Sequence, residues 1–212
     1  MGQNVNGITV ERRTPDYFVI HQSSSGYHLE LLPLRVPPFV SVCFRSPDGK
    51  VVTDRDLNMY RHPDLINFKP DPSLQYIEIG AGLGELTTAI AASNPEKLPI
   101  IIDPADYITM GIILEGTLTK DLTPLMRHRL KKVLDRQNLV ISNKVQLINM
   151  TLEEAMVRHP EIRGTGDVVI DYHGPVNHEN TPLSYIEILN LERQLRTPLG
   201  KHIFWGTAIE GA

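Results

Sequence analysis

The sequence lacks several features that define other classes of protein. It has a single cysteine, Cys43, which excludes a disulfide framework and any zinc site built from cysteines. No apolar run approaches the roughly 20 residues of a membrane-spanning helix. A basic and then apolar start, typical of a secretory signal, is also missing. We therefore expect a cytoplasmic protein without a membrane partner, in which Cys43 is a buried small hydrophobic residue.

An excess of basic residues is missing too. The 212 residues include 21 Lys and Arg against 25 Asp and Glu, a formal net charge of −4. Dedicated nucleic-acid binders are strongly basic, so we do not expect a nucleic-acid partner. The basic cluster within residues 124–137 alternates with apolar residues at helical spacing, which is typical of the solvated face of a surface helix.

The pattern of predicted secondary structure changes near residue 70. Residues 1–70 consist of short β-like runs, and Asp48-Gly49 between two of them predicts a hairpin. Prolines at 63, 70 and 72 indicate a connector. We predict a β-rich segment over 1–70 that serves as a lid, a substrate cap or a dimer arm. The sequence leaves the oligomeric state open.

Residues 71–212 alternate between strand-like and helix-like segments. Such alternation predicts an α/β fold with a parallel sheet covered on both faces. We expect strands over 75–79, 98–102, 145–148, 167–170 and 202–205, and helices over 85–92, 107–115, 124–137, 152–158 and 183–196.

The most informative motif joins the first of these strands to its helix. Glu78 precedes a turn with glycines at positions 80, 82 and 84. Glycines allow close approach of the backbone to a ligand, and a helix N-terminus attracts negative charge. A dinucleotide fingerprint would need its third glycine at position 85, where the chain has Glu85, and this disfavours a nicotinamide-dependent oxidoreductase.

The Glu-x-Gly-x-Gly-x-Gly pattern resembles motif I of the class I S-adenosylmethionine (SAM)-dependent methyltransferases. The residues from Glu78 to Thr87 are especially similar to the corresponding motif of rRNA adenine dimethyltransferases. The resemblance implies a Rossmann-like parallel sheet of methyltransferase type and SAM as cofactor. It implies contacts to SAM from one set of residues: Glu78, Gly80, Ala81, Gly82 and Gly84 in and before the turn, Asp103 at the ribose, Asn149 or Thr151 at the adenine, and Asp171 at the methyl group.

Other parts depart from that family. Asn149 or Thr151 stands where an aspartate is usual. The fourth strand ends in Asp171-Tyr172-His173-Gly174 rather than the Asn/Asp-Pro-Pro-Tyr type of base methylases, which argues against methylation of nucleic-acid bases. The family's sixth and seventh strands have no room after Gly206. Either the sequence is truncated, or the sheet is shortened, or the N-terminal strands complete it.

Catalytic candidates follow the fourth strand, because ligands of open α/β sheets bind beyond the carboxyl ends of strands. Asp171 would line the methyl site, and Tyr172 would face the acceptor. His173 or His178 would remove a proton, since histidine titrates near neutral pH. We expect no metal, because the spacing of these histidines and Glu179 fits no zinc motif.

These observations favour SAM-dependent methyl transfer to an oxygen, nitrogen or carboxylate of a small molecule or protein. Three alternatives stay open. One is a non-catalytic, methyltransferase-like binding or scaffold protein, another is an RNA base methyltransferase, and the last is a nucleotide-dependent oxidoreductase.

Overall fold

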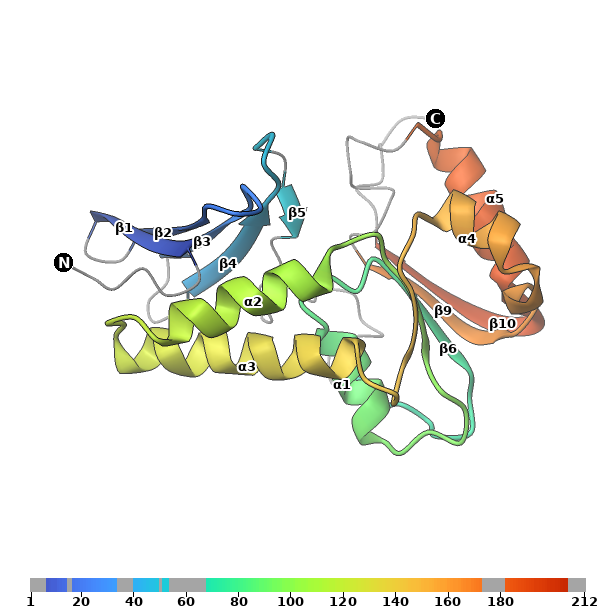
Figure 1. The fold of residues 1–212 in the computed structure, drawn as a ribbon. Coiled ribbons are helices and arrows are strands. Elements are labelled where there is room, and N and C mark those ends of the chain that lie inside the picture. Colours follow the sequence, from blue (N-terminus) through green and yellow to red (C-terminus); the bar gives the residue numbers. More distant parts are fainter. Residues whose placement is uncertain are drawn as a thin grey trace. The chain divides into compact units, whose positions relative to one another are not determined.

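The computed structural model describes residues 7–14, 17–33, 40–49, 51–53, 68–172 and 182–205. The chain divides into two compact units. Unit 1 consists of Met1–Met59 and Ala105–Asn138, and unit 2 of Tyr60–Pro104 and Leu139–Ala212. Each unit has its own sheet (Figure 1).

Unit 1 contains an antiparallel sheet in which neighbouring strands follow one another in sequence. Its five described strands are β1 (Ile8–Thr14), β2 (Tyr17–Gln22), β3 (His28–Pro33), β4 (Val40–Arg45) and β5 (Val51–Thr53). The hairpin predicted at Asp48-Gly49 is confirmed. Gly49 has a φ of 83°, and its N–H donates to the carbonyl of Ser46 at 2.9 Å.

The two faces of this sheet differ in polarity because paired residues share a face. Ile20, Leu29 and Phe44 pair in register and are fully buried. The opposite face carries charged and imidazole side chains, among them Glu30 and Arg45, which lie 3.0 Å apart. Cys43 is buried on this face, as predicted.

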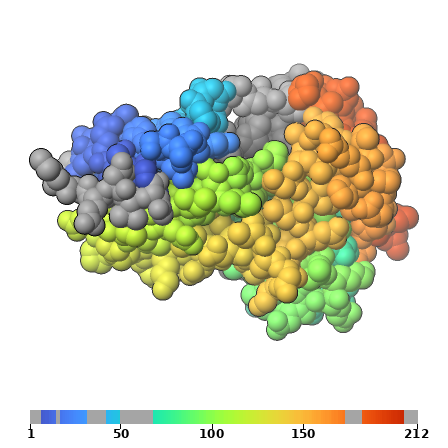
Figure 2. Space-filling model, viewed as in Figure 1, coloured from blue at the N-terminus to red at the C-terminus, as the bar shows by residue number. Residues whose placement is uncertain are grey.

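Two helices complete unit 1. Helix α2 (Tyr107–Leu118) contacts β1 and β2, and α3 (Pro124–Val140) follows it. The hydroxyl of Thr123 accepts a hydrogen bond from the Met126 N–H at 3.3 Å, as expected of an N-cap before a proline. Most of the basic side chains of α3 are exposed, which confirms an amphipathic helix. Figure 2 shows α2 in green and α3 in yellow as space-filling surfaces.

Unit 2 contains a parallel sheet in the order β10-β9-β6-β7-β8. Its five described strands are β6 (Tyr76–Ile79), β7 (Ile100–Ile102), β8 (Gln146–Ile148), β9 (Gly166–Tyr172) and β10 (Arg196–Trp205). Counted along the chain, the spatial order is third, second, first, fourth, fifth. The order therefore reverses between β6 and β9, which is where open α/β sheets bind their ligands.

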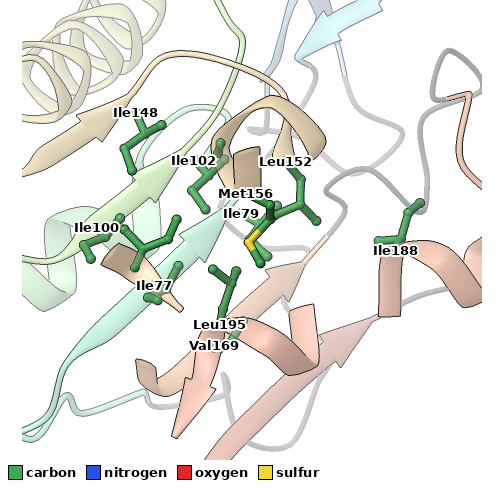
Figure 3. Packing of buried hydrophobic residues seen from close by; sticks show 12 residues of the cluster. Ile77, Ile79, Ile100, Ile102, Ile148, Leu152, Met156, Val169, Ile188 and Leu195 are labelled. Atoms are coloured by element: carbon green, nitrogen blue, oxygen red, sulfur yellow. The ribbon is translucent and has the colours of Figure 1, made fainter. Parts of the chain in front are cut away.

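Helices cover both faces of the parallel sheet. Helices α4 (Leu152–Arg158) and α5 (Tyr185–Leu195), with the short 3₁₀ turn η3 (Pro160–Ile162), pack on one face around Ile77, Ile79 and Val169 (Figure 3). Helix α1 (Glu85–Ala92) packs on the other face through Leu86 and Ile90. A strand buried on both faces is largely apolar, which explains the three isoleucines of β7 and the apolar residues of β6 on either side of the buried Glu78.

The predicted α/β fold is thus confirmed for residues of unit 2. The described N-terminal strands pair only with one another, so they do not complete the parallel sheet. One grouping was not foreseen: residues 105–138, which interrupt the parallel-sheet segment, cluster with the N-terminal strands. None of the helices in the described ranges combines the length and apolarity needed to cross a lipid bilayer.

Candidate functional site

The glycine turn after β6 adopts a backbone that only glycine accommodates without strain. The φ angles of Gly80, Gly82 and Gly84 are 66°, 56° and 74°, all in the left-handed region. A side chain there costs roughly 1–2 kcal/mol per residue. The positive φ angles therefore explain why all three positions of the motif are glycine. Ala81, which follows Gly80, is fully buried.

The neighbouring strand β7 holds this turn in place. The Gly80 N–H donates to the carbonyl of Ile102 at 2.9 Å, and the Gly82 N–H donates to Oδ2 of Asp103 at 3.1 Å. The Asn149 side chain, which follows β8, donates to the carbonyl of Asp103 at 2.9 Å. Asp103 is 5% exposed. The residues after three adjacent strands are thus connected by hydrogen bonds at the carboxyl edge.

Glu78 connects the strand before the turn to the helix after it. Its side chain is buried, and Oε2 accepts a hydrogen bond from the Thr87 hydroxyl of α1 at 2.6 Å. Helix α1 begins after Gly84, and no side chain of the described residues caps it. The first turn of α1 therefore presents backbone N–H groups at the end of β6, at the point where the strand order reverses.

Thr151 has a structural role that the resemblance did not imply. It is the N-cap of α4, and its hydroxyl accepts from the Glu154 N–H at 3.4 Å while the Glu154 carboxylate accepts from the Thr151 N–H at 3.4 Å. This is a capping box. Both Asn149 and Thr151 are exposed at the carboxyl edge.

The end of β9 lies beside the glycine turn, because Asp171 pairs with Ile79 in register. Asp171 and Tyr172 are both buried, at 0% and 2% exposure, and they point to opposite faces. Tyr172 packs with the side chains of α1. His173 and His178, the predicted bases, lie outside the described residues.

Two ionisable residues that sequence reasoning missed lie next to Asp171. Glu192 of α5 is fully buried, and its Oε2 lies 2.8 Å from Nε2 of His202 on β10. Burial raises the pKa of Glu192 to about 7, while the neighbouring Asp171 acts in the opposite direction. Burial also lowers the pKa of His202, while the nearby Asp171 acts in the other direction. A sequence signal existed, since Glu192 falls within the apolar stripe of Ile188 and Leu195.

No three His, Cys, Asp or Glu side chains in the described ranges are grouped so that they could hold a metal ion. No family model matches the chain, and no curated protein matches it significantly in sequence. Functional inference for this protein therefore depends on the geometry of the carboxyl edge in unit 2.

Proposed function

We propose that unit 2 binds SAM and that the protein transfers a methyl group to an oxygen, nitrogen or carboxylate of a small molecule or protein. The observation that carries this proposal is the glycine turn. Its three left-handed glycines lie where the strand order reverses, and the Asp103 carboxylate of the next strand is hydrogen-bonded to Gly82. This combination places close backbone approach and a carboxylate side by side.

The residues present fit the parts of such a ligand. The turn from Gly80 to Gly84 allows a ligand close to the backbone, and the first turn of α1, which has no side-chain cap among the described residues, offers backbone donors to a carboxylate group. Asp103 provides a carboxylate for a ribose diol, because two oxygens match two hydroxyls. Glu78 would support the site indirectly, because its carboxylate accepts a hydrogen bond from Thr87 and so holds α1 in position. SAM itself would supply an electrophilic methyl group on a sulfonium sulfur.

Methyl transfer by direct displacement requires alignment of the acceptor and sometimes removal of its proton. The carboxyl end of β9 is the place for this step, since it adjoins the turn. Asp171 and Tyr172 are enclosed between the sheet and its helices. We therefore assign them to shaping the site, and we keep His173 and His178 as the candidate proton acceptors.

The enclosure of Asp171 and Tyr172 also favours a second candidate function, that of a SAM-binding protein without catalysis. Both candidates share the ligand and differ in turnover. Transfer of labelled methyl groups from SAM to a pool of metabolites or proteins supports the enzyme. Binding without any transfer supports the non-catalytic alternative.

Calorimetric titration with SAM and S-adenosylhomocysteine tests the shared step. We expect micromolar binding, weakened at least tenfold by Gly82→Ala and by Asp103→Ala. Gly164→Ala is the matched control, because Gly164 also has a left-handed φ of 67° but nothing lies within 4 Å of an added Cβ. Both glycine variants incur similar backbone strain, and only the first should lose affinity.

Two results would overturn the proposal. One is no binding of either ligand at millimolar concentration, and the other is equal loss of affinity in Gly82→Ala and Gly164→Ala. Titration with NAD(H) and NADP(H) under the same conditions checks the oxidoreductase alternative. Binding of RNA with a steep salt dependence would favour the base methylase instead.

A further inference from the structure

The first turn of α5 exposes apolar side chains at the carboxyl edge of the parallel sheet. Helix α5 contacts β9 and β10, and it ends at Leu195, directly before β10 begins (Figure 1). The helix therefore runs antiparallel to β10, and its start lies beside the end of that strand. Tyr185 and Ile186, the first two residues of α5, are 45% and 69% exposed. Adjacent exposed apolar side chains, unlike single ones, indicate a contact surface.

Tyr185 belongs to the face of α5 that packs on the sheet. It shares this face with Ile188 and Leu195, which are buried and follow it at helical spacing. Its ring contacts that of Phe204 of β10 edge to face, with 5.6 Å between the centroids. Tyr185 is nevertheless almost half exposed, so the layer between α5 and the sheet is open at this end.

The rings of Tyr185 and Phe204 adjoin the candidate ligand site. Phe204 pairs in register with Asp171 of β9, and Asp171 pairs with Ile79, the residue before Gly80. Adjacent strands are about 4.8 Å apart, so the backbone of Phe204 lies about 10 Å from that of Ile79. A methyl group presented at the end of β9 would therefore be one strand away from the two rings.

The chemistry of this surface fits one aromatic ring. Aromatic side chains attract another ring by offset stacking or edge-to-face contact, beyond the gain from apolar burial. Ile186 adds an aliphatic side to the same surface. Stable protein interfaces bury about 800 Å² on each partner, which is far more than a few partly exposed side chains offer. The surface therefore suits a small molecule.

The charge at the start of α5 disfavours an anionic ligand. Ser184 and Glu187 form a capping box, in which Oε2 of Glu187 accepts a hydrogen bond from the Ser184 N–H at 2.8 Å. Hydrogen bonds from Ser184 lower the pKa of Glu187, so this carboxylate is ionised at neutral pH. Helix α1 has no side-chain cap among the described residues and offers backbone donors to an anion. The start of α5 instead presents a negative charge.

We propose that Tyr185, Ile186 and Phe204 form an acceptor subsite, which binds a neutral aromatic small molecule carrying a hydroxyl or amino group. The inference rests on the proposed function, because it names the class of acceptor for the same site. The acceptor oxygen or nitrogen would attack the methyl carbon of SAM and form the new bond. The carbon–sulfur bond would break with its electron pair left on sulfur, which gives S-adenosylhomocysteine. The proton of the acceptor would pass to a base or to water.

Titration of the protein saturated with S-adenosylhomocysteine, followed by NMR, tests the acceptor subsite with three probes. Phenol has the ring and the hydroxyl, cyclohexanol has the hydroxyl without an aromatic face, and benzoate has the ring with a negative charge. We expect phenol to bind about fivefold more tightly than either of the others.

Variants of the wild type locate the phenol site. Tyr185→Ala should weaken phenol binding about fivefold, whereas Tyr185→Phe keeps the ring and should leave the binding unchanged. Ile186→Ala should weaken it about twofold. The matched control is Val157→Ala, because Val157 is 77% exposed but lies near the end of α4, away from the carboxyl edge where that helix begins. All four variants should bind S-adenosylhomocysteine as the wild type does.

The outcomes separate the two proposals. If S-adenosylhomocysteine binds but phenol binds no more tightly than cyclohexanol and benzoate, this inference is overturned and the proposed function stays intact. That comparison uses the wild type alone and needs no variant that must fold. Equal affinity for phenol in the wild type and Tyr185→Ala also overturns the inference. If neither SAM nor S-adenosylhomocysteine binds the wild type, the proposed function fails and this inference fails with it.

Discussion

The two units treat ionisable side chains in opposite ways. In unit 1 the polar face of the antiparallel sheet carries Glu30, whose carboxylate lies 3.0 Å from Arg45. In unit 2 both faces of the parallel sheet are covered, and Asp171 and Glu192 are fully enclosed, with Glu192 Oε2 2.8 Å from Nε2 of His202. Paired charges near a surface are ordinary in a stable sheet. Enclosed carboxyl groups are costly, and they are typical of functional sites.

The largest expected effect compares the cores of the two sheets. Ile77 lies in the central strand of the parallel sheet and is fully buried, so Ile77→Ala should lower the free energy of unfolding by about 3–4 kcal/mol. Val10 lies on the edge strand β1 and is only half-buried, so Val10→Ala should cost about 1 kcal/mol or less. Urea unfolding followed by circular dichroism measures both. Equal losses would contradict the contrast between a doubly covered and a singly covered sheet.

A Glu→Gln substitution should have opposite signs in the two units. Glu192→Gln removes a carboxyl group that resists ionisation, and it should raise the free energy of unfolding at pH 8 by on the order of 2 kcal/mol. Glu30→Gln leaves Arg45 without a carboxylate partner and should lower the free energy of unfolding by about 1 kcal/mol. Urea titrations at pH 8 provide both values. A change of the same sign in both variants would contradict the predicted difference between the two units.

The pH dependence sharpens the same test. The pKa of Glu192 is raised from 4.5 to about 7 on folding, so the folded state binds more protons in that range and stability falls as pH rises through it. The pKa of His202 is lowered, so its contribution is lost as pH falls below about 6.5. In Glu192→Gln only the second effect remains. Stability of this variant should therefore rise more steeply between pH 5 and pH 7 than that of the wild type.

The smallest effect concerns how tightly α2 packs on the sheet of unit 1. A Cβ at Gly116 would clash with the side chain of Ile8, whereas a Cβ at Gly111 of the same helix meets nothing. Gly111→Ala should stabilise by about 0.5–1 kcal/mol through helix propensity. Gly116→Ala should destabilise by about 1 kcal/mol, because overpacking outweighs that gain. Thermal unfolding measures both, and adding Ile8→Val should relieve the second variant. A stabilising Gly116→Ala would show that α2 is loosely packed.

Much of the fold was predictable because the decisive signals are local. Alternating patterns, the Asp48-Gly49 turn and the Thr123-Pro124 helix start identify most elements within a few residues of their observed bounds. The spacing of Thr151 and Glu154 is itself a capping-box signature, so the structural role of Thr151 could have been predicted. The predicted site residues Gly82, Asp103 and Asn149 meet because parallel strands end at one edge.

The rest depends on contacts between distant parts of the chain. Nothing local assigns residues 105–138 to the N-terminal strands, since that grouping arises from the packing of α2 on β1 and β2. The cluster around Glu192 was missed for a related reason. A glutamate in an apolar stripe has two outcomes, a side chain that reaches solvent and one that is enclosed. Only the position of β9 and β10 beneath α5 decides between them.

Helix α5 ends at Leu195, and β10 begins at the next residue. Glu192 and His202 are therefore close along the chain, and closing so short a segment costs little conformational entropy. Their contact should form as soon as α5 packs against β10, before the long-range pairing of β9 with β6 is complete. The amide protons of α5 and β10 should then exchange with solvent as one cooperative block. The contact between Glu192 and His202 would thus mark an early step in the folding of unit 2.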